Sequence, residues 1–354
     1  MSEESETIIE KKGRAGRITL NRPKALNALT RQMCLDMTEA LLEWRDDPDV
    51  KVVVVDGAGD RGFCAGGDIR LLYESGKAGD ERAYEFWRDE YRLNQLIKRY
   101  SKPYVAMIDG IVMGGGVGVS VHGDYRVAGD STMLAMPETG IGFYPDVGGT
   151  YFLPRLPGKT GMWMGLTGAR LKTADAMAIG IATSYTPSDK RPALIEALEC
   201  GPDGIEDTLA AFAEEAGESE LKKRQEDIET HFAAPMVEAI LASLDNDRSD
   251  WAIEQAKTMR TKSPTSLKLT HRAIQMWAQT EFEDTMRREL RLSAHCLKGH
   301  DFYEGVRAQI IDKDRDPKWD PSDLERVGDA ELEQYFAPLD DDRELTFIDD
   351  TKDN

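Results

Sequence analysis

Two apolar runs, each followed by glycines, constrain the fold of this 354-residue chain more than any other feature. They are residues 50–56 (VKVVVVD) and residues 103–109 (PYVAMID). Neither run shows the strict apolar–polar alternation of a strand with one wet face. Such runs are typical of strands buried on both faces, which occur in parallel sheets covered by helices. The pattern therefore predicts an α/β fold.

The segments around these runs carry helical periodicity. A helix is predicted to begin after Thr30, a residue type suited to the N-cap position. Its apolar positions recur at three- and four-residue spacing: Met33, Met37, Ala40, Leu41 and Trp44. A second amphipathic helix is predicted over residues 81–100, and a third is predicted to begin near Gly115. The remaining short strands are predicted at residues 17–20, 125–128 and 132–135. No fixed-period repeat occurs, which excludes solenoids and propellers.

The second half of the chain has a different composition. After about residue 190, β-branched runs disappear and charged helical segments dominate, one of them beginning at Ser263 and Pro264. The last fifteen residues include seven acidic ones, which predicts a solvated tail. We therefore expect an α/β core over residues 1–190, a helical region over residues 191–335 and an acidic tail over residues 336–354.

Charge and composition exclude several classes of function. The chain has 45 basic and 65 acidic residues and a net charge of −20, which argues against sequence-independent nucleic-acid binding. No run of about 18 apolar residues is present, so no membrane span is predicted. The start of the chain is polar and acidic, without an export signal, and the four cysteines are widely spaced. These features predict a cytoplasmic protein with reduced thiols.

Several catalytic motifs are absent. The chain has no GxSxG nucleophile elbow and no HExxH zinc motif. The sequence around Lys159 lacks the leading glycine of a phosphate loop, and Val121 stands where a dinucleotide fingerprint needs its third glycine. Of the five histidines, only His295 and His300 lie near each other in the sequence, close to Cys296. Ordinary surface or packed histidines are the favoured interpretation, so no metal site is predicted.

Two glycine clusters remain, in residues 63–69 (FCAGGDI) and 108–118 (IDGIVMGGGVG). Each cluster lies between a predicted buried strand and a helix. Glycine lets the backbone approach a ligand closely, and the first turn of a helix leaves N–H groups without partners. Two such N–H groups that converge would form an oxyanion hole. Alternatively, the glycines only permit tight strand–helix turns.

A third segment, residues 136–149 (MPETGIGFYPDVGG), supplies carboxylates. Glu138 follows a proline among apolar residues, so burial would raise its pKa and suit it to acid, base or nucleophile chemistry. Asp146 follows eight residues later, between a proline and a double glycine. A rigid loop could hold both acids on one cavity. Alternatively, both cap neighbouring backbone groups.

Together these segments resemble the crotonase (enoyl-CoA hydratase/isomerase) superfamily. The resemblance begins at ITLNRP (residues 18–23) and extends to about residue 320. It is closest to the 3-hydroxyisobutyryl-CoA hydrolase branch, through AMPETGIGFYPDVGGTYFLPRLPG and HDFYEGVRAQIIDKDRDPKW. The resemblance implies a spiral core of ββα units with a helical C-terminal region. It also implies an acyl-CoA substrate and no separate cofactor, since coenzyme A is part of the substrate.

The resemblance also implies roles for individual residues. The N–H groups of Gly67 and Gly115 would form the oxyanion hole. Coenzyme A would bind along two loops, at Arg22, Lys24, Ala25, Leu26, Ala28, Ala65, Gly66, Asp68 and Ile69. Because the chain is strongly acidic, the phosphates of coenzyme A need a local basic patch, for which Arg22 and Lys24 are the candidates.

The acidic residues distinguish the branches of the superfamily. Hydratases carry a glutamate just after the glycine cluster, where this chain has Gly118, and a second one at the position of Glu138. Asp146 occupies a site that is commonly glycine in hydratases and acidic in hydrolases, and Glu90 matches an acid that lies beside the substrate hydroxyl. We therefore expect hydrolysis of 3-hydroxyisobutyryl-CoA, a step of valine breakdown, or of a relative such as 3-hydroxypropionyl-CoA.

Alternatives stay open. Glu138 could act as the nucleophile or as a general base, with Asp146 orienting water or the acyl hydroxyl. An enoyl-CoA hydratase or isomerase could use the same scaffold. A non-catalytic acyl-CoA-binding protein is a different class, against which the retained Glu138 and Asp146 argue. Homo-oligomerisation is left open as well.

Overall fold

The computed structural model describes residues 5–201 and 204–348. The chain divides into two compact units, each assembled from separate stretches of sequence. The first unit comprises residues 1–68, 92–134 and 171–222, and the second comprises residues 69–91, 135–170 and 223–354. The expected boundary near residue 190 divides the chain into consecutive segments, whereas these units combine separate stretches. That boundary therefore stays a prediction. The two units are described in turn.

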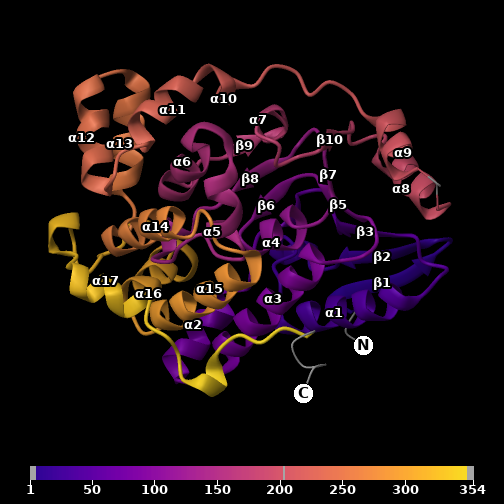
Figure 1. Ribbon diagram of the computed structural model, residues 1–354, viewed down its shortest axis with the longest axis horizontal. Helices are drawn as coiled ribbons and strands as arrows, with labels where there is room; N and C mark the ends of the chain where they lie inside the picture. Colours follow the sequence, from indigo (N-terminus) through magenta and orange to yellow (C-terminus); the bar gives the residue numbers. More distant parts are fainter. Residues whose placement is uncertain (1–4, 202–203, 349–354) are drawn as a thin grey trace. The chain divides into compact units, whose positions relative to one another are not determined.

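A six-stranded sheet forms the centre of the first unit (Figure 1). Its strands, in spatial order, are β1 (Thr7–Lys12), β2 (Ala15–Leu20), β3 (Val52–Gly57), β5 (Tyr104–Ile108), β7 (Tyr125–Ala128) and β10 (Ser184–Tyr185). β1 pairs antiparallel with β2, and every other pair is parallel. The two apolar runs form the neighbouring inner strands β3 and β5, and residues 52–55 are fully buried. The predicted parallel α/β core is confirmed.

A second sheet presents the glycine loops. Its order is β4 (Gly62–Cys64), β6 (Ile111–Met113), β8 (Met133–Ala135) and β9 (Leu171–Lys172). β4 and β6 run parallel, so the loops that follow them leave the sheet at the same edge. The first glycine cluster follows β4. The second follows β6 and leads into α4 (Gly115–Val121), the helix predicted near Gly115.

The helices of the first unit include α1 (Arg31–Asp46), α7 (Thr173–Ala178), α8 (Arg191–Glu199) and α9 (Ile205–Phe212). The Thr30 hydroxyl accepts a hydrogen bond from the Met33 N–H at 3.3 Å, which confirms the predicted cap of α1. α8 and α9 bury Leu194, Leu198 and Ile205 against valines of β3 and β5. These two helices therefore cover the sheet, although sequence composition grouped them with the helical region.

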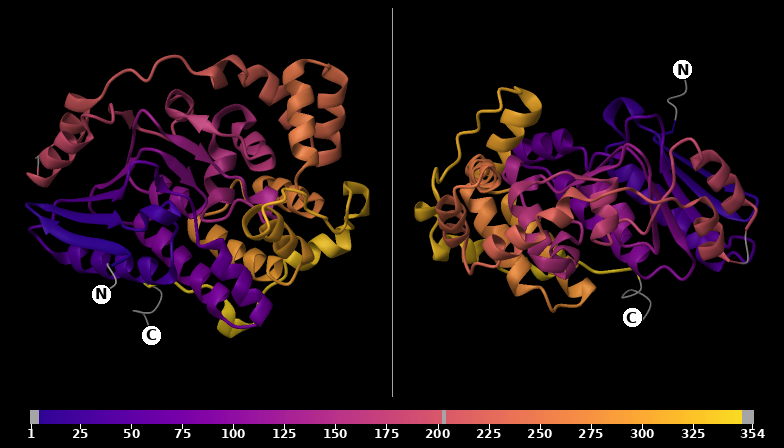
Figure 2. Two further views of the ribbon diagram at one scale, coloured as in Figure 1. Left: turned by 180° about the vertical axis from the view of Figure 1, so that it is seen from behind. Right: turned by 90° about the horizontal axis from the view of Figure 1, so that it is seen from above.

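The second unit is largely helical. Its helices include α2 (Ile69–Ala78), residues 82–91 of α3 (Arg82–Lys98), α5 (Gly149–Phe152), α6 (Thr160–Thr167), α11 (Gln225–Phe232), α12 (Val237–Asp247), α13 (Asp250–Arg260), α14 (Pro264–Met276), α15 (Phe282–Cys296), α16 (His300–Val306) and α17 (Asp329–Tyr335). α12 and α13 lie side by side (Figure 2). The Ser263 hydroxyl accepts from the Ser266 N–H at 3.0 Å, as predicted for the start of α14. A short helix, α10 (Glu220–Lys223), lies where the chain passes from the first unit to the second.

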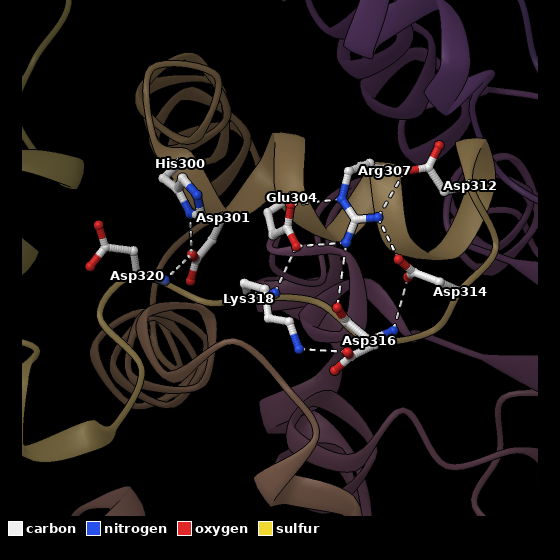
Figure 3. A network of polar contacts seen from close by, with 9 residues as sticks. All are labelled: His300, Asp301, Glu304, Arg307, Asp312, Asp314, Asp316, Lys318 and Asp320. Carbon is white, nitrogen blue, oxygen red and sulfur yellow. Dashed lines mark hydrogen bonds and ion pairs between the residues drawn. The ribbon is translucent and has the colours of Figure 1, made fainter.

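A network of charged residues fixes the chain after α16 (Figure 3). The Arg307 guanidinium forms ion pairs with Glu304 at 2.8 Å, Asp312 at 2.8 Å and Asp314 at 2.6 Å. Glu304 also accepts from the Lys318 backbone N–H at 2.7 Å. One arginine thus holds the charged segment 312–318, part of the sequence that carries the family resemblance.

The acidic tail is not wholly solvated. Asp340, Asp341 and Asp342 are exposed, as expected. However, Leu345 and Phe347 are buried, and Glu344 forms an ion pair with Arg291 at 2.9 Å. The prediction of a solvated tail is therefore wrong for residues 344–347, because two apolar side chains anchor this stretch. Residues 349–354 of the predicted tail lie outside the described residues.

The structure also tests two expectations about chemistry and membranes. All four cysteines lie within the described ranges, and none forms a disulfide. In the part of the chain that the structure describes, no helix has the length and apolarity that crossing a bilayer requires.

Candidate active site

The two glycine loops of the first unit lie against each other. Gly66 has a φ of +111°, which is strained for any residue with a side chain. A Cβ atom added there would lie 3.4 Å from the Met113 carbonyl oxygen and 3.6 Å from the Gly115 nitrogen. At Gly116, an added Cβ would lie 2.2 Å from the Cys64 carbonyl oxygen, so only glycine fits. The two loops therefore pack closely on each other, and an approach of their backbone to a ligand stays a prediction.

The backbone around Gly67 is tied down on both sides. The Leu29 N–H donates to the Gly66 carbonyl at 2.8 Å, and the Asp68 N–H donates to the Leu29 carbonyl at 2.9 Å. Gly115 is the first residue of α4, so its N–H has no partner within the helix. A preorganised backbone of this kind suits oxyanion binding. Assigning that role to Gly67 and Gly115 remains a prediction.

The loop predicted to bind the nucleotide end of coenzyme A is shaped by Arg22. Its guanidinium donates to the Ala28 carbonyl at 2.6 Å and forms ion pairs with Glu6 and Asp68, each at 3.0 Å. These carboxylates neutralise Arg22, whereas Lys24 is exposed. Of the two basic residues predicted to attract phosphate, Lys24 is therefore the better placed, and Arg22 holds the loop and Asp68 together.

The rest of this loop is shaped by a residue that sequence reasoning missed. Asn27 is fully buried, and its amide donates to the Ala58 carbonyl at 3.0 Å and to the Gly62 carbonyl at 2.9 Å. Leu26 and Asn27 both have positive φ angles, so the backbone turns sharply here. Ala25 is exposed, and Leu26 and Ala28 are half-buried. These three predicted coenzyme A contacts are thus accessible, whereas Gly66 is buried, and the role of each stays a prediction.

In the second unit, the structure brings the three predicted acids together. Glu138 begins the 3₁₀ helix η2 (Glu138–Ile141), Asp146 lies in the loop before α5, and Glu90 lies on α3. Their exposed fractions are 6%, 6% and 1%. Burial, and then the charge of Asp146, raises the pKa of both Glu90 and Glu138 well above the usual range. The acids therefore act on one another electrostatically.

Close packing fixes the turn that carries Glu138. Gly142, with a φ of +72°, leaves room for α16, because an added Cβ would lie 2.0 Å from the Asp301 carbonyl oxygen. Likewise, a Cβ on Gly305 would lie 2.3 Å from the Ile141 carbonyl carbon. The Ser263 N–H donates to the Thr139 carbonyl at 3.2 Å, which ties α14 to the same turn. Two glycines and a helix start thus position the glutamate.

A cation also faces this turn. Lys262 is half-buried, and its Nζ would lie 3.4 Å from a Cβ added to Gly140, within η2. Burial, together with the charge of Arg170, lowers the pKa of Lys262, and Glu138 opposes that effect. In return, Lys262 partly offsets the rise in the pKa of Glu138. Sequence reasoning did not identify Lys262.

Asp146 is held by hydroxyl groups. The Tyr91 oxygen lies 2.7 Å from Asp146 Oδ2 and 2.7 Å from Ser293 Oγ on α15. The Tyr144 oxygen lies 2.9 Å from the same Oγ. Burial raises the pKa of Asp146 to about 7, and the Tyr91 hydroxyl opposes the rise because it can donate to the carboxylate.

A fourth acid, Glu289, organises the loop that follows Asp146. It is fully buried on α15 and accepts from the Gly148 N–H at 2.7 Å, from the Thr150 N–H at 3.0 Å and from the Thr150 hydroxyl. Burial raises the pKa of Glu289 to about 8 despite these bonds. The sequence signal was an acid at an apolar helical position, between Met286 and Leu290.

Some polar atoms of the site have no protein partner. Among the described residues, Glu90 Oε1 and Glu138 Oε2 are buried without a hydrogen bond. Unpaired buried oxygens are costly, so they indicate a place for a ligand or water. Aromatic rings keep the surroundings apolar: Trp87 stacks on Phe143 with centroids 5.4 Å apart, and Phe302 lies 5.8 Å from Phe143. The arrangement suits acid, base or nucleophile chemistry by carboxyl groups.

Comparison with known proteins shows the family to which the sequence is similar. The sequence model of a family described as "Enoyl-CoA hydratase/isomerase" matches residues 15–336. Relatives named "3-hydroxyisobutyryl-CoA hydrolase, mitochondrial" include one from Danio rerio, 48% identical over 95% of this chain and 91% of the relative. The relative of that name from Homo sapiens is 46% identical over 94% of this chain and 89% of its own length.

Solved structures agree with the fold. A carnitinyl-CoA dehydratase from Mycobacterium thermoresistibile is 46% identical, with a TM-score of 0.93 over 98% of this chain and 99% of its own. An enoyl-CoA hydratase from Rhodobacter sphaeroides is 41% identical, with a TM-score of 0.91 over 97% of this chain and 100% of its own. The predicted fold class, an α/β core of this type with a helical C-terminal region, is confirmed.

Proposed function

The chain belongs to the enoyl-CoA hydratase/isomerase (crotonase) family, and from this premise we propose that it hydrolyses 3-hydroxyisobutyryl-CoA to 3-hydroxyisobutyrate and coenzyme A. Relatives named as hydrolases of this thioester are 46–48% identical over nearly the whole chain. A related short β-hydroxyacyl-CoA, such as 3-hydroxypropionyl-CoA, would present the same thioester and hydroxyl groups.

The single observation that carries the proposal is the composition of the buried acid cluster. Glu138 lies with Asp146 and Glu90, all nearly inaccessible to solvent. The position at which a hydratase carries its other glutamate is Gly118, which is buried within α4 and offers no side chain. Water addition to a double bond by two glutamates would therefore lack one acid, whereas thioester hydrolysis needs one nucleophile or base and a means of orienting water.

Each residue then has a role in the proposed reaction. Glu138 attacks the thioester carbonyl, so that a carbon–oxygen bond forms, the carbon–sulfur bond breaks and the thiolate of coenzyme A leaves. Water then hydrolyses the resulting anhydride. In the other version, Glu138 takes a proton from water, which attacks the carbonyl directly. In both, the N–H groups of Gly67 and Gly115 bind the developing oxyanion.

The other two acids would serve the substrate hydroxyl. The acyl group carries a free β-hydroxyl, and the unpaired Glu90 Oε1 is a buried acceptor for it. Asp146 would orient the attacking water or the same hydroxyl. An acyl group without this hydroxyl would leave Glu90 Oε1 unpaired, which supports a preference for β-hydroxyacyl chains.

A direct assay distinguishes hydrolysis from hydration. Purified protein is incubated with 3-hydroxyisobutyryl-CoA, measuring thiol release, and with crotonyl-CoA, measuring loss of the enoyl absorbance. We expect thiol release from the first and little hydration of the second. Rapid hydration of crotonyl-CoA without thiol release would instead favour a hydratase, the activity for which the Rhodobacter sphaeroides protein is named.

A single-turnover experiment in ¹⁸O-labelled water distinguishes the two roles of Glu138. If Glu138 is the nucleophile, the anhydride contains the Glu138 carboxyl carbon. Water that attacks this carbon leaves ¹⁸O in the Glu138 side chain. If it is a general base, all the label enters the acid product. Mass spectrometry of the peptide that contains Glu138 reads the outcome.

The relatives' names bear on location as well. The hydrolases are named as mitochondrial, and the two solved structures come from bacteria. A cytoplasmic location therefore stays a prediction for this chain, and so does its oligomeric state.

A further inference from the structure

A chain of short oxygen–oxygen contacts runs from Asp146 into α15. Asp146 Oδ2 lies 2.7 Å from the Tyr91 oxygen, which lies 2.7 Å from Ser293 Oγ. Ser293 Oγ lies 2.9 Å from the Tyr144 oxygen, which lies 2.6 Å from the Glu289 carbonyl oxygen. Tyr91, Tyr144 and Ser293 are fully buried. Five oxygens thus make four contacts in one unit of the protein.

Each of these contacts needs a proton, because two oxygens this close repel each other unless a hydrogen lies between them. The three hydroxyls supply three protons. The Glu289 carbonyl can only accept. If Asp146 is ionised it can also only accept, so one of the four contacts has no proton. If Asp146 is protonated, it supplies the fourth.

We propose that Asp146 carries a proton in the free protein, and that Tyr91, Ser293 and Tyr144 are positioning residues that hold it in this form. The Asp146 carboxyl then donates to Tyr91, Tyr91 to Ser293, Ser293 to Tyr144, and Tyr144 to the Glu289 carbonyl. All four contacts are satisfied in this direction alone. As an account of catalysis the inference rests on the proposed hydrolysis, but the protonation state can be measured without it.

The charges around Asp146 support the same protonation state. Glu90 faces it from α3, Glu138 from η2, and Glu289 and Cys296 from α15. Each of these groups is neutral or negative, and all are buried. Burial disfavours a further negative charge in this cluster, and it raises the pKa of Asp146 accordingly.

The chain can also reverse. When Asp146 loses its proton, the Tyr91 hydroxyl turns to the carboxylate and makes a charge-assisted bond, and Ser293 donates to Tyr91. The contact between Ser293 and Tyr144 then lacks a proton. Asp146 can therefore give up and regain a proton in the reaction cycle if the hydroxyl hydrogens of Tyr91 and Ser293 rotate and the 2.9 Å contact between Ser293 and Tyr144 lengthens.

The proton count predicts opposite effects for two small substitutions. Tyr91→Phe removes the hydroxyl that donates to the ionised carboxylate, so the titration midpoint of Asp146 should rise by about one pH unit. Ser293→Ala removes the acceptor that Tyr91 needs when Asp146 is protonated, but leaves Tyr91 able to donate to the carboxylate. The midpoint should then fall. Tyr144→Phe should also lower it, because Ser293 then lacks its acceptor in the protonated arrangement.

The test is an NMR titration of the free, full-length protein labelled with ¹³C at aspartate carboxyl carbons. The Asp146 signal is assigned by its loss in Asp146→Asn. Tyr100→Phe is the matched control, since its hydroxyl donates to the Leu41 carbonyl in the first unit. A wild-type midpoint near neutrality that rises in Tyr91→Phe and falls in Ser293→Ala supports the proposal.

Other outcomes overturn it. An Asp146 signal that stays ionised down to about pH 5 contradicts the proton count directly. Midpoint shifts of the same sign in Tyr91→Phe and Ser293→Ala, or unchanged midpoints in both, also contradict it. A purely structural role of these residues does not predict shifts of opposite sign. Tyr144→Phe gives an independent reading if Ser293→Ala fails to fold. The titration uses no substrate, so a protein that releases no thiol from the thioester could still show the expected midpoints. Failure of the proposed hydrolysis and failure of the proposed protonation state are therefore distinguishable.

Discussion

At the scale of single residues, Asp146 is held by side chains that lie far from it in the sequence, namely Tyr91 at 2.7 Å and, through Tyr91, Ser293. Glu138 and Asp146 were identifiable because proline and glycine frame them within an apolar segment. Tyr91, Ser293 and Glu289 were not, because each lies on a helix at a position that periodicity marks only as buried. Their importance comes from distances across the second unit, such as the 2.7 Å between Tyr91 and Ser293. Such distances cannot be predicted from the composition of the chain or from the spacing of residues along it.

Glu138→Gln should abolish turnover while leaving acyl-CoA binding largely intact. Glutamine keeps the size of the side chain but can neither attack a carbonyl nor take a proton, so we expect kcat to fall by about 10³-fold or more. Calorimetry should show a Kd for the product coenzyme A within a few-fold of wild type. A near-normal kcat would show that another group does the chemistry.

Lys262→Met should move the pH profile of kcat/KM to higher pH. Glu138 must be ionised to act as nucleophile or base, so the rate rises as pH passes through its pKa. The Lys262 charge lowers that pKa, and removing it should raise the pKa and shift the rising limb upward. Lys262→Arg, which keeps the charge, is the matched control. Coincident profiles for the Met and Arg variants would refute this coupling.

At the scale of elements, local signals predicted well where a residue acts within its own segment. Thr30 and Ser263 cap α1 and α14 as expected, and the apolar runs form β3 and β5. Prediction failed where an element's partner lies far along the chain. The packing of α8 on the sheet and the burial of Leu345 both depend on such partners. The local sequences of these two segments do not differ from those of charged surface segments.

The contact between η2 and α16 predicts the effect of Gly142→Ala. The new Cβ would meet the Asp301 carbonyl at 2.0 Å, so η2 and α16 must separate. Overpacking of this kind costs roughly 1–3 kcal/mol, in addition to strain at positive φ. We expect a lower Tm and a lower kcat, because the same turn carries Glu138.

Gly79→Ala is the matched control for that substitution. Gly79 also has a positive φ, +69°, and lies in the second unit, but an added Cβ meets nothing within 4 Å. The Gly79→Ala variant should lose only the stability that corresponds to backbone strain, and its kcat should stay normal. Equal losses of Tm and kcat in the two variants would mean that backbone strain, and not the contact with α16, accounts for the effect.

At the scale of the whole molecule, the net charge of −20 has two components with different consequences. Exposed acids such as Asp340, Asp341 and Asp342 stay in water and repel one another only weakly through solvent and salt. The buried acids Glu90, Glu138, Asp146 and Glu289 lose hydration on folding. This second group links folding to protons in one direction, whereas burial lowers the pKa of His271 and His295, which act in the opposite direction.

The stability of the folded chain should therefore fall as pH rises from about 4 to about 8. Folding raises the pKa of all four buried acids, to about 7 for Asp146 and about 8 for Glu289. In this window the four acids bind more protons in the native state than in the unfolded chain, so their contribution to the free energy of unfolding decreases with pH. Each acid contributes a slope of at most about 1.4 kcal/mol per pH unit. Asp146→Asn should flatten the decline in Tm measured by calorimetry, while Asp340→Asn, which removes one exposed charge, should not. A Tm that stays constant across this range would mean that the buried acids titrate as they do in the unfolded chain.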